Sequence, residues 1–149
     1  MKFLRIGAKG KEKPAAIDRD GKIRDISSHI NDLNPSNLNF DTISKIQSVD
    51  LSNLPELSSS ERIGSCITNP GKFVAIGLNY SDHAAETGAA VPTEPIMFMK
   101  APSSICGPND DVEIVAGSKK LDWEVELGII IGKEAKHISE NQSQDHILG

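Results

Sequence analysis

Aromatic residues and cysteines are scarce in this sequence of 149 residues. Aromatics make up 4% of the chain, against 38% hydrophobic and 25% charged residues, a balance typical of a globular protein and not of a disordered one. Cys66 and Cys106 lack C-x-x-C spacing, and no feature of the sequence indicates an oxidising compartment. We therefore interpret both as reduced structural thiols, which excludes a fold held by disulfides.

Long hydrophobic runs and clusters of positive charge are also missing. The N-terminus, MKFLRIGAKGKEK, has no apolar stretch after its charges, and no segment approaches the length of a membrane-spanning helix. The 16 basic residues are scattered among 21 acidic ones, and the net charge of −5 argues against a nucleic-acid partner. We expect a cytoplasmic protein that binds neither membrane nor nucleic acid and whose partner is a small molecule.

A polar connection from Ser58 to about Lys72 predicts a domain boundary. A chain of this length fits either one ordinary domain or a small domain joined to part of a larger one. We assign residues 1–65 to a small N-terminal α+β domain and residues 66–149 to a second domain.

Short strands dominate the elements that the sequence predicts. In the first domain, KFLRIG and KIRDIS predict two strands, with an Asp-Gly turn before the second, and FDTISKIQSVDLSNL predicts one short helix. In the second domain we expect the strand FVAIGL, the helix SDHAAETG ended by Gly88, the strand IMFM, a turn at residues 107–110, the strand VEIV, a strand over residues 120–131 and a polar, helix-like tail. The predicted fold class is α+β, mostly β.

Residues 120–131, KLDWEVELGIII, join an acidic stretch to a strongly apolar one. In a strand Asp122, Glu124 and Glu126 share one face, whereas the apolar residues from Leu127 onward occupy both faces, as in a strand covered on both sides. Carboxylates at the edge of a core repel one another and are costly to desolvate unless a cation or a proton neutralises them. A bound divalent cation would meet both costs. A solvated acidic face is the alternative that this stretch alone leaves open.

His83 and Glu86 form a second candidate pair in GLNYSDHAAETG. Three residues apart, they lie side by side on one helical turn, where the carboxylate can hold the imidazole in one tautomer as a positioned general base. Polar residues of an exposed helix often have this spacing by chance, so the pair alone does not show that His83 and Glu86 are catalytic. Its place directly after an apolar strand favours function, because loops at strand ends commonly carry chemistry.

The string IGLNYSDHAAETGAAVPTEPIMFMKAPSSICGPNDDVEI, followed by DWEVELGIIIGKEAK, resembles the fumarylacetoacetate hydrolase family in its bacterial members. The two strings cover about half of the chain in the order of the family pattern. Members of this type are often labelled 2-hydroxyhepta-2,4-diene-1,7-dioate isomerase, ureidoglycolate lyase or fumarylpyruvate hydrolase. The resemblance implies that residues 66–149 are the first part of a catalytic β-roll and that the protein is a homodimer.

The resemblance also implies roles for five residues. Glu124 and Glu126 match the two glutamates that bind a divalent cation, usually Mg²⁺, with Mn²⁺ or Ca²⁺ accepted, and hard cations prefer such oxygen ligands. His83 matches the catalytic histidine and Glu86 its acidic partner. Lys100 falls where the family places a basic residue near the substrate, and a solvated lysine is its alternative.

The implied activity is metal-dependent chemistry on a 2-oxo or β-diketo acid. C–C bond hydrolysis, isomerisation or decarboxylation would each pass through a metal-stabilised enolate, and the sequence does not separate them. Family members are longer, with a third metal carboxylate on a later strand, so we expect the present chain to be an N-terminal fragment. The alternative is a non-catalytic module that retains the motifs.

Overall fold

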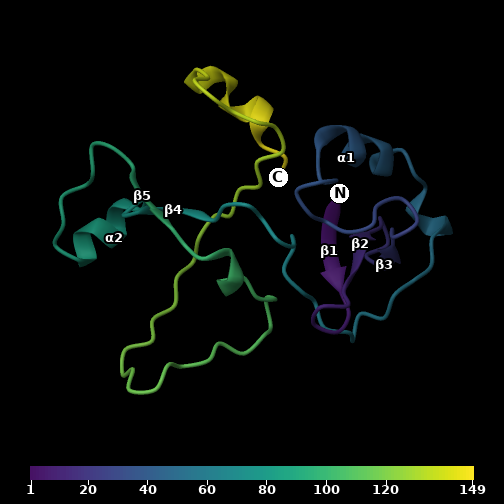
Figure 1. Cartoon of the computed structure of the whole chain (residues 1–149), viewed down its shortest axis with the longest axis horizontal. Helices are drawn as coiled ribbons and strands as arrows, with labels where there is room; N and C mark the ends of the chain where they lie inside the picture. The colour runs from purple at the N-terminus through teal and green to yellow at the C-terminus, as the bar shows by residue number, and fades with distance from the viewer. The chain divides into compact units, whose positions relative to one another are not determined.

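The computed structural model describes residues 1–149 and divides the chain into two compact units. The first unit contains Met1–Thr68 and Cys106–Gly149, and the second contains Asn69–Ile105 (Figure 1). None of the helices is both long and apolar enough to span a membrane. These compact units do not test the predicted domain boundary between residues 65 and 66, because the first unit combines N-terminal and C-terminal residues. That boundary stays a prediction.

A three-stranded antiparallel sheet forms the first unit's framework. Its strands β1 (Lys2–Ile6), β2 (Lys13–Ile17) and β3 (Ile23–Asp25) follow one another in the order β1-β2-β3. The predicted Asp-Gly turn joins β2 to β3, with Gly21 at φ +80°. Strand β2 was missed by the sequence analysis because Pro14 cannot donate to a ladder and is unusual in a central strand. Its carbonyl still accepts a bond from the backbone N of Ile26 at 3.1 Å.

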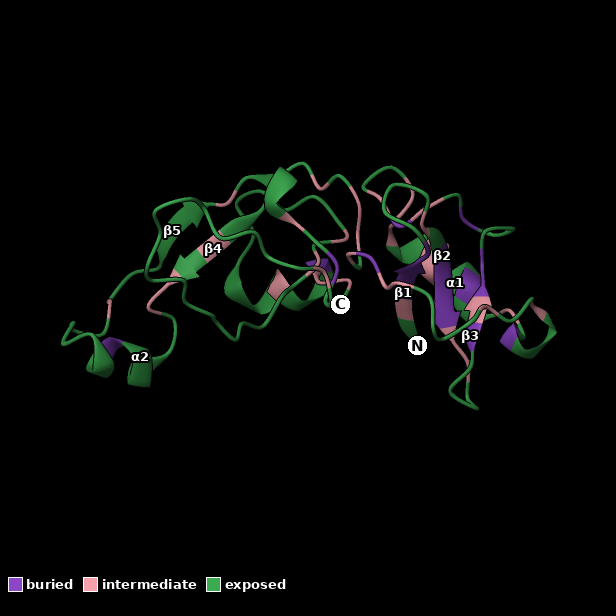
Figure 2. Cartoon of the chain, turned by 90° about the horizontal axis from the view of Figure 1, so that it is seen from below, coloured by how far each residue is buried: buried purple, intermediate pink, exposed green.

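The buried hydrophobic residues form two clusters, one between the sheet and the predicted helix and one of sheet residues packed against Leu57 and Ile63. Helix α1 (Phe40–Gln47) is capped by Asn39, whose side chain accepts from the backbone N of Thr42 at 3.0 Å, and a short 3-10 helix, η1 (Leu51–Asn53), follows it. The buried residues gather in β1–β3, α1 and the adjoining loops (Figure 2). The cluster under α1 consists of Ala16, Ile26, Ile30, Leu33, Ile46 and Leu51.

The second unit is a β-hairpin with a helix in its connection. Strands β4 (Val74–Gly77) and β5 (Ile96–Met99) pair antiparallel, and α2 (Ser81–Glu86) lies between them in the sequence. Gly88, at φ +68°, follows the helix as the sequence predicted. The strands FVAIGL and IMFM and the helix SDHAAETG are therefore found where they were expected. All of β5 is exposed, and β4 alternates between exposed and half-buried residues (Figure 2).

The strands predicted at residues 112–115 and 120–131 are wrong for this structure. Residues 111–130 contain no regular strand, and Trp123 is 81% exposed. Pairing occurs only at the end of the run, where the backbone N of Leu148 donates to the oxygen of Ile130 at 2.8 Å and Ile131 bridges to Ile147. The 3-10 helix η3 (Glu140–His146) lies in the sequence between the two paired segments, where the polar tail was expected to be helix-like. Alternation of polar and apolar residues predicts the two faces of a strand but does not supply a neighbouring strand. Without a neighbouring strand the hydrogen-bonded ladder does not form.

A cluster of charged side chains joins the two stretches of the first unit. The Arg62 guanidinium donates to both carboxylate oxygens of Asp110, at 2.6 and 2.5 Å, and to Oε1 of Glu12 at 2.7 Å. The second oxygen of Glu12 lies 3.4 Å from Nη2 of Arg5, whose guanidinium also binds Asp32 at 2.7 and 3.0 Å. Paired forks of this kind are among the stronger side-chain hydrogen bonds.

The cluster shifts the proton equilibria of its members. The two hydrogen bonds from Arg62, with one from the backbone N of Gly107 at 2.8 Å, lower the pKa of Asp110 to about 2. The hydrogen bonds that Arg62 donates to Asp110 and Glu12 raise the pKa of its guanidinium. Burial raises the pKa of Glu12, but hydrogen bonds from its backbone and Arg62, with the charge of Arg5, lower it overall.

Acid is expected to weaken the link between Arg62 and Asp110. Because the folded pKa of Asp110, about 2, lies below its ordinary value of 3.8, the carboxylate stabilises the fold above pH 3.8 and loses this effect as the pH falls towards 2. Asp110→Asn should therefore melt at a lower temperature than the native chain near neutral pH, and the difference should close between about pH 4 and pH 2. Circular dichroism melts of both proteins across this range measure the difference, and one that does not change with pH would contradict the assignment.

Candidate catalytic and metal site

The candidate catalytic pair lies on α2, immediately after β4. His83 and Glu86 are both exposed on this six-residue helix, and no hydrogen bond joins the imidazole to the carboxylate. Asp82 Oδ1 accepts from the backbone N of His83 at 2.9 Å. Between β4 and α2, Leu78 adopts φ +50°, a left-handed conformation that a branched side chain rarely takes. Asn69 and His137 adopt the same region, so the conformation of Leu78 fixes the turn into α2 without marking a site.

Lys100 follows β5 in the same unit. Its backbone N donates to the oxygen of Phe73 at 2.9 Å, which extends the β4–β5 ladder by one step and fixes where the lysine leaves the hairpin. The residue is half-buried. The second unit thus carries three of the five predicted site residues on one continuous strand–helix–strand stretch.

The two candidate metal ligands lie in the first unit. Glu124 and Glu126 are exposed and lie two residues apart in a segment without regular secondary structure. No group of three or more His, Cys, Asp or Glu side chains in the structure is arranged to hold a metal ion. Two carboxylates at alternate positions supply the hard oxygen donors that Mg²⁺ prefers, so the chemistry of this donor set fits the ion.

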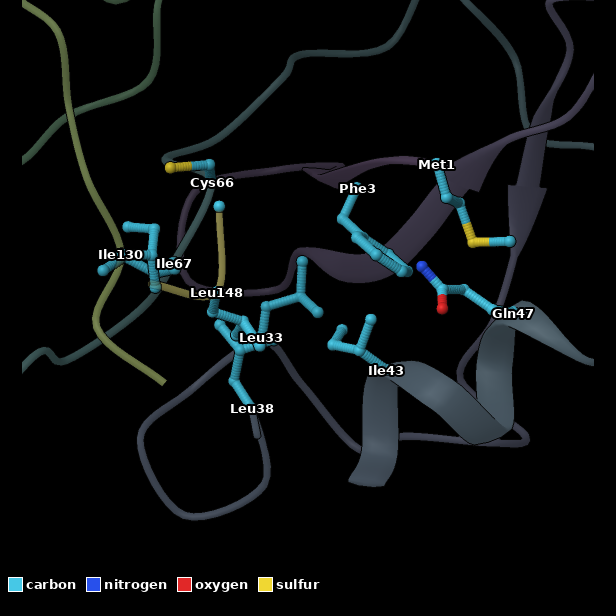
Figure 3. Close-up of a pocket in the computed structure, with 11 residues that line it drawn as sticks. Met1, Phe3, Leu33, Leu38, Ile43, Gln47, Cys66, Ile67, Ile130 and Leu148 are labelled. Carbon is cyan, nitrogen blue, oxygen red and sulfur yellow. The ribbon is translucent and has the colours of Figure 1, made fainter. Parts of the chain in front are cut away.

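Two features of the first unit were not predicted from the sequence. One is the charged cluster around Arg62. The other is an apolar cavity of about 270 Å³ that is lined by β1, α1, the connecting loops and the C-terminal stretch (Figure 3). Neither left a local signal, because Arg62 and Asp110 are 48 residues apart and the cavity is lined from several distant segments. The cavity's lining residues are Met1, Phe3, Leu33, Leu38, Ile43, Gln47, Cys66, Ile67, Ile130, Leu148 and Gly149.

Comparison with known families gives a match over the second half of the sequence. Residues 72–149 match the family described as fumarylacetoacetate (FAA) hydrolase C-terminal. The chain belongs to the fumarylacetoacetate hydrolase family. The matched range contains the exposed pair on α2, Lys100 and both candidate metal ligands. The resemblance found in the sequence is therefore confirmed.

Curated relatives cover the whole chain. Two proteins named "Putative hydrolase", from Burkholderia lata and Burkholderia ambifaria, are each 49% identical to it over 149 residues. The match covers 100% of this chain and 53% of each relative. The chain thus spans about half the length of the curated relatives it matches.

Solved structures confirm the fold class. The fumarylacetoacetate hydrolase of the psychrophile Exiguobacterium antarcticum superposes with a TM-score of 0.76 at 29% identity, covering 100% of this chain and 53% of that one. A protein from Mycobacterium smegmatis, titled "putative HpcE protein", gives a TM-score of 0.71 at 29% identity, covering 97% and 52%. An α+β, mostly β fold of the fumarylacetoacetate hydrolase type is therefore established for these residues.

Proposed function

We propose that this chain is part of a metal-dependent enzyme that acts on 2-oxo or β-diketo acids. The observation that carries the proposal is the family match over residues 72–149, which includes every residue of the candidate site. The fold relationship to the Exiguobacterium antarcticum hydrolase supports it. We further propose that the whole protein is a homodimer, as the family resemblance implies.

In this proposal Glu124 and Glu126 hold the cation. The two carboxylates lie two residues apart in one exposed segment, and together they bring two negative charges to a divalent ion. Mg²⁺ is the expected ion, with Mn²⁺ or Ca²⁺ as substitutes. The chemistry that the ion supplies when bound is Lewis acidity towards a substrate carbonyl.

His83 is the proposed proton carrier. Its imidazole would take a proton from water or from a substrate carbon and return it later, and Glu86, one helical turn away, would orient the ring. Lys100 would bind a carboxylate or carbonyl oxygen of the substrate through its ammonium group. The same residues would serve three reactions: in C–C bond hydrolysis His83 would deprotonate the water that attacks the carbonyl, in decarboxylation the bond to a carboxylate would break with release of CO₂, and in isomerisation a proton would leave one carbon and return to another.

Calorimetric titration with Mg²⁺ and an acylpyruvate turnover assay test the proposal. With two carboxylates, the 149-residue chain should bind Mg²⁺ weakly, with a dissociation constant of roughly 10⁻³ M, because affinity rises with ligand number and charge. Acylpyruvate turnover by this chain should be negligible, since the family site uses a third carboxylate. The absence of any Mg²⁺-dependent heat would contradict the metal assignment and favour a non-catalytic module. Tight binding with turnover would contradict the expected need for the third ligand.

A further inference from the structure

An exposed row of apolar side chains runs along residues 121–131 of the first unit. Every odd-numbered position in this range is a large hydrophobic residue, and each of these residues is more than half exposed. Trp123 is 81% exposed, although tryptophan is mostly covered in folded proteins. Monomeric proteins rarely leave so contiguous a set of apolar side chains in water, so we expect a partner to cover it. This apolar row consists of Leu121, Trp123, Val125, Leu127, Ile129 and Ile131.

The apolar row has the spacing of a strand but forms no ladder along its length. Residues 121–130 contain no regular strand, and the bridge between Ile131 and Ile147 lies at the end of the row. In a sheet, side chains at every second residue point to one face, so a neighbouring strand would gather the whole row on one side. The kind of partner that fits is therefore a polypeptide that adds a strand, because backbone hydrogen bonds then hold it while the alternate side chains are covered together.

A second copy of the chain is a poor partner for the apolar row. The positions between its members include Asp122, Glu124 and Glu126. Side chains directly opposite one another in a ladder lie on the same face, so two copies that join their apolar rows also bring their acidic positions together. Antiparallel pairing centred on Glu124 places Asp122 opposite Glu126, and like charges in that position destabilise a sheet. The row fits a strand of a different sequence.

The relatives indicate where a strand of different sequence comes from. The Burkholderia ambifaria protein is 49% identical over all 149 residues, yet the match covers only 53% of that protein. The Exiguobacterium antarcticum structure likewise superposes the whole of this chain on 53% of its own. In both proteins, nearly half of the polypeptide lies outside the matched part and has no counterpart in these 149 residues. That part accompanies the same fold in the relatives, as a covering partner must.

We propose that the apolar row is a docking surface for a separate polypeptide equivalent to the part of the relatives that lies outside the match. This polypeptide adds a strand along residues 121–129 and covers the side chains from Trp123 to Ile129. The two polypeptides form a one-to-one complex. Docking depends on apolar burial and strand pairing, so it does not depend on the metal chemistry proposed above.

Co-expression tests the proposal. The tagged 149-residue chain is produced together with the longest stretch of the Burkholderia ambifaria relative that lies outside the match, as a second polypeptide. The second polypeptide should co-purify with the chain, and light scattering should give the mass of a one-to-one complex. Hydrogen exchange measured by mass spectrometry should show the amides of residues 121–129 exchanging at least about tenfold more slowly in the complex than in the chain alone, because strand pairing protects them.

Two valine substitutions form a matched pair. Val125→Asp places a charge within the apolar row, whereas Val115→Asp makes the same change outside it, and the two valines are 75% and 76% exposed. Because both side chains are exposed, neither change should unfold the chain. Recovery of the second polypeptide should fall at least about tenfold with Val125→Asp, since a charge buried against the added strand is costly, and stay within about twofold with Val115→Asp. If circular dichroism melts show that Val125→Asp does not fold, Leu127→Asp replaces it.

The two polypeptides fused into one chain, in the order of the relative, are the positive control for protection of residues 121–129. Failure to recover the second polypeptide with the native chain overturns the proposal, as does equal recovery with the two valine variants. Protection of residues 121–129 in the chain alone that grows with its concentration also overturns it, because the apolar row is then covered by a second copy.

Discussion

Replacement of Glu124 by glutamine is expected to lower the affinity of the chain for Mn²⁺ about tenfold or more, whereas His83→Ala should leave it within about twofold. Glutamine keeps the size of the side chain but removes a full negative charge from the donor pair. His83 lies on α2 and is assigned to proton transfer, so its loss removes no ligand charge. Glu126→Gln should behave like Glu124→Gln. Electron paramagnetic resonance of free Mn²⁺ measures each dissociation constant.

Asp122→Asn is the matched control for this series. It removes one charge from the same exposed segment at a residue with no assigned ligand role, and Oδ1 of Asp122 accepts a local bond from the backbone N of Trp123 at 2.9 Å. A general loss of negative potential would weaken Mn²⁺ binding equally in Asp122→Asn and Glu124→Gln. Such equality, or an equal loss in His83→Ala, would contradict the separate roles.

Ile26→Ala is expected to cost about 2–5 kcal/mol of unfolding free energy, because it removes a fully buried side chain from the cluster under α1 and leaves a cavity. Leu127→Ala removes the same volume from a side chain that is 79% exposed and should cost within about 0.5 kcal/mol. Since small domains are stable by only about 5–15 kcal/mol, the first substitution should unfold a large part of the population under mild denaturant. Urea unfolding followed by circular dichroism measures both.

The contrast between these two substitutions locates the core of the chain in solution. If Leu127→Ala lowers the unfolding free energy as much as Ile26→Ala, the segment around Leu127 is buried in solution by association between chains, although it is exposed in the single chain. Repeating the unfolding at several protein concentrations identifies that case, because association makes stability depend on concentration.

Local features of the fold could be predicted from the sequence. The pattern of apolar residues placed β4, β5 and α1, the Asp-Gly dipeptide placed the turn before β3, and Gly88 marked the end of α2. Each of these depends on neighbours within a few residues, because backbone preferences and side-chain periodicity act over one turn or one strand. The candidate site was named from motif and resemblance, and its residue roles remain predictions.

Long-range features were decided only by the tertiary structure. Strand β2 contains Pro14 and was therefore not predicted, but it forms because β1 and β3 pair with it on both sides. Conversely, residues 120–130 have the alternation of a strand but form no regular strand and are almost all exposed. The contact of Arg62 with Asp110 and Glu12 spans 48 and 50 residues of sequence. Pairing of this kind depends on which distant segments the folded chain brings together, and no local pattern encodes that choice.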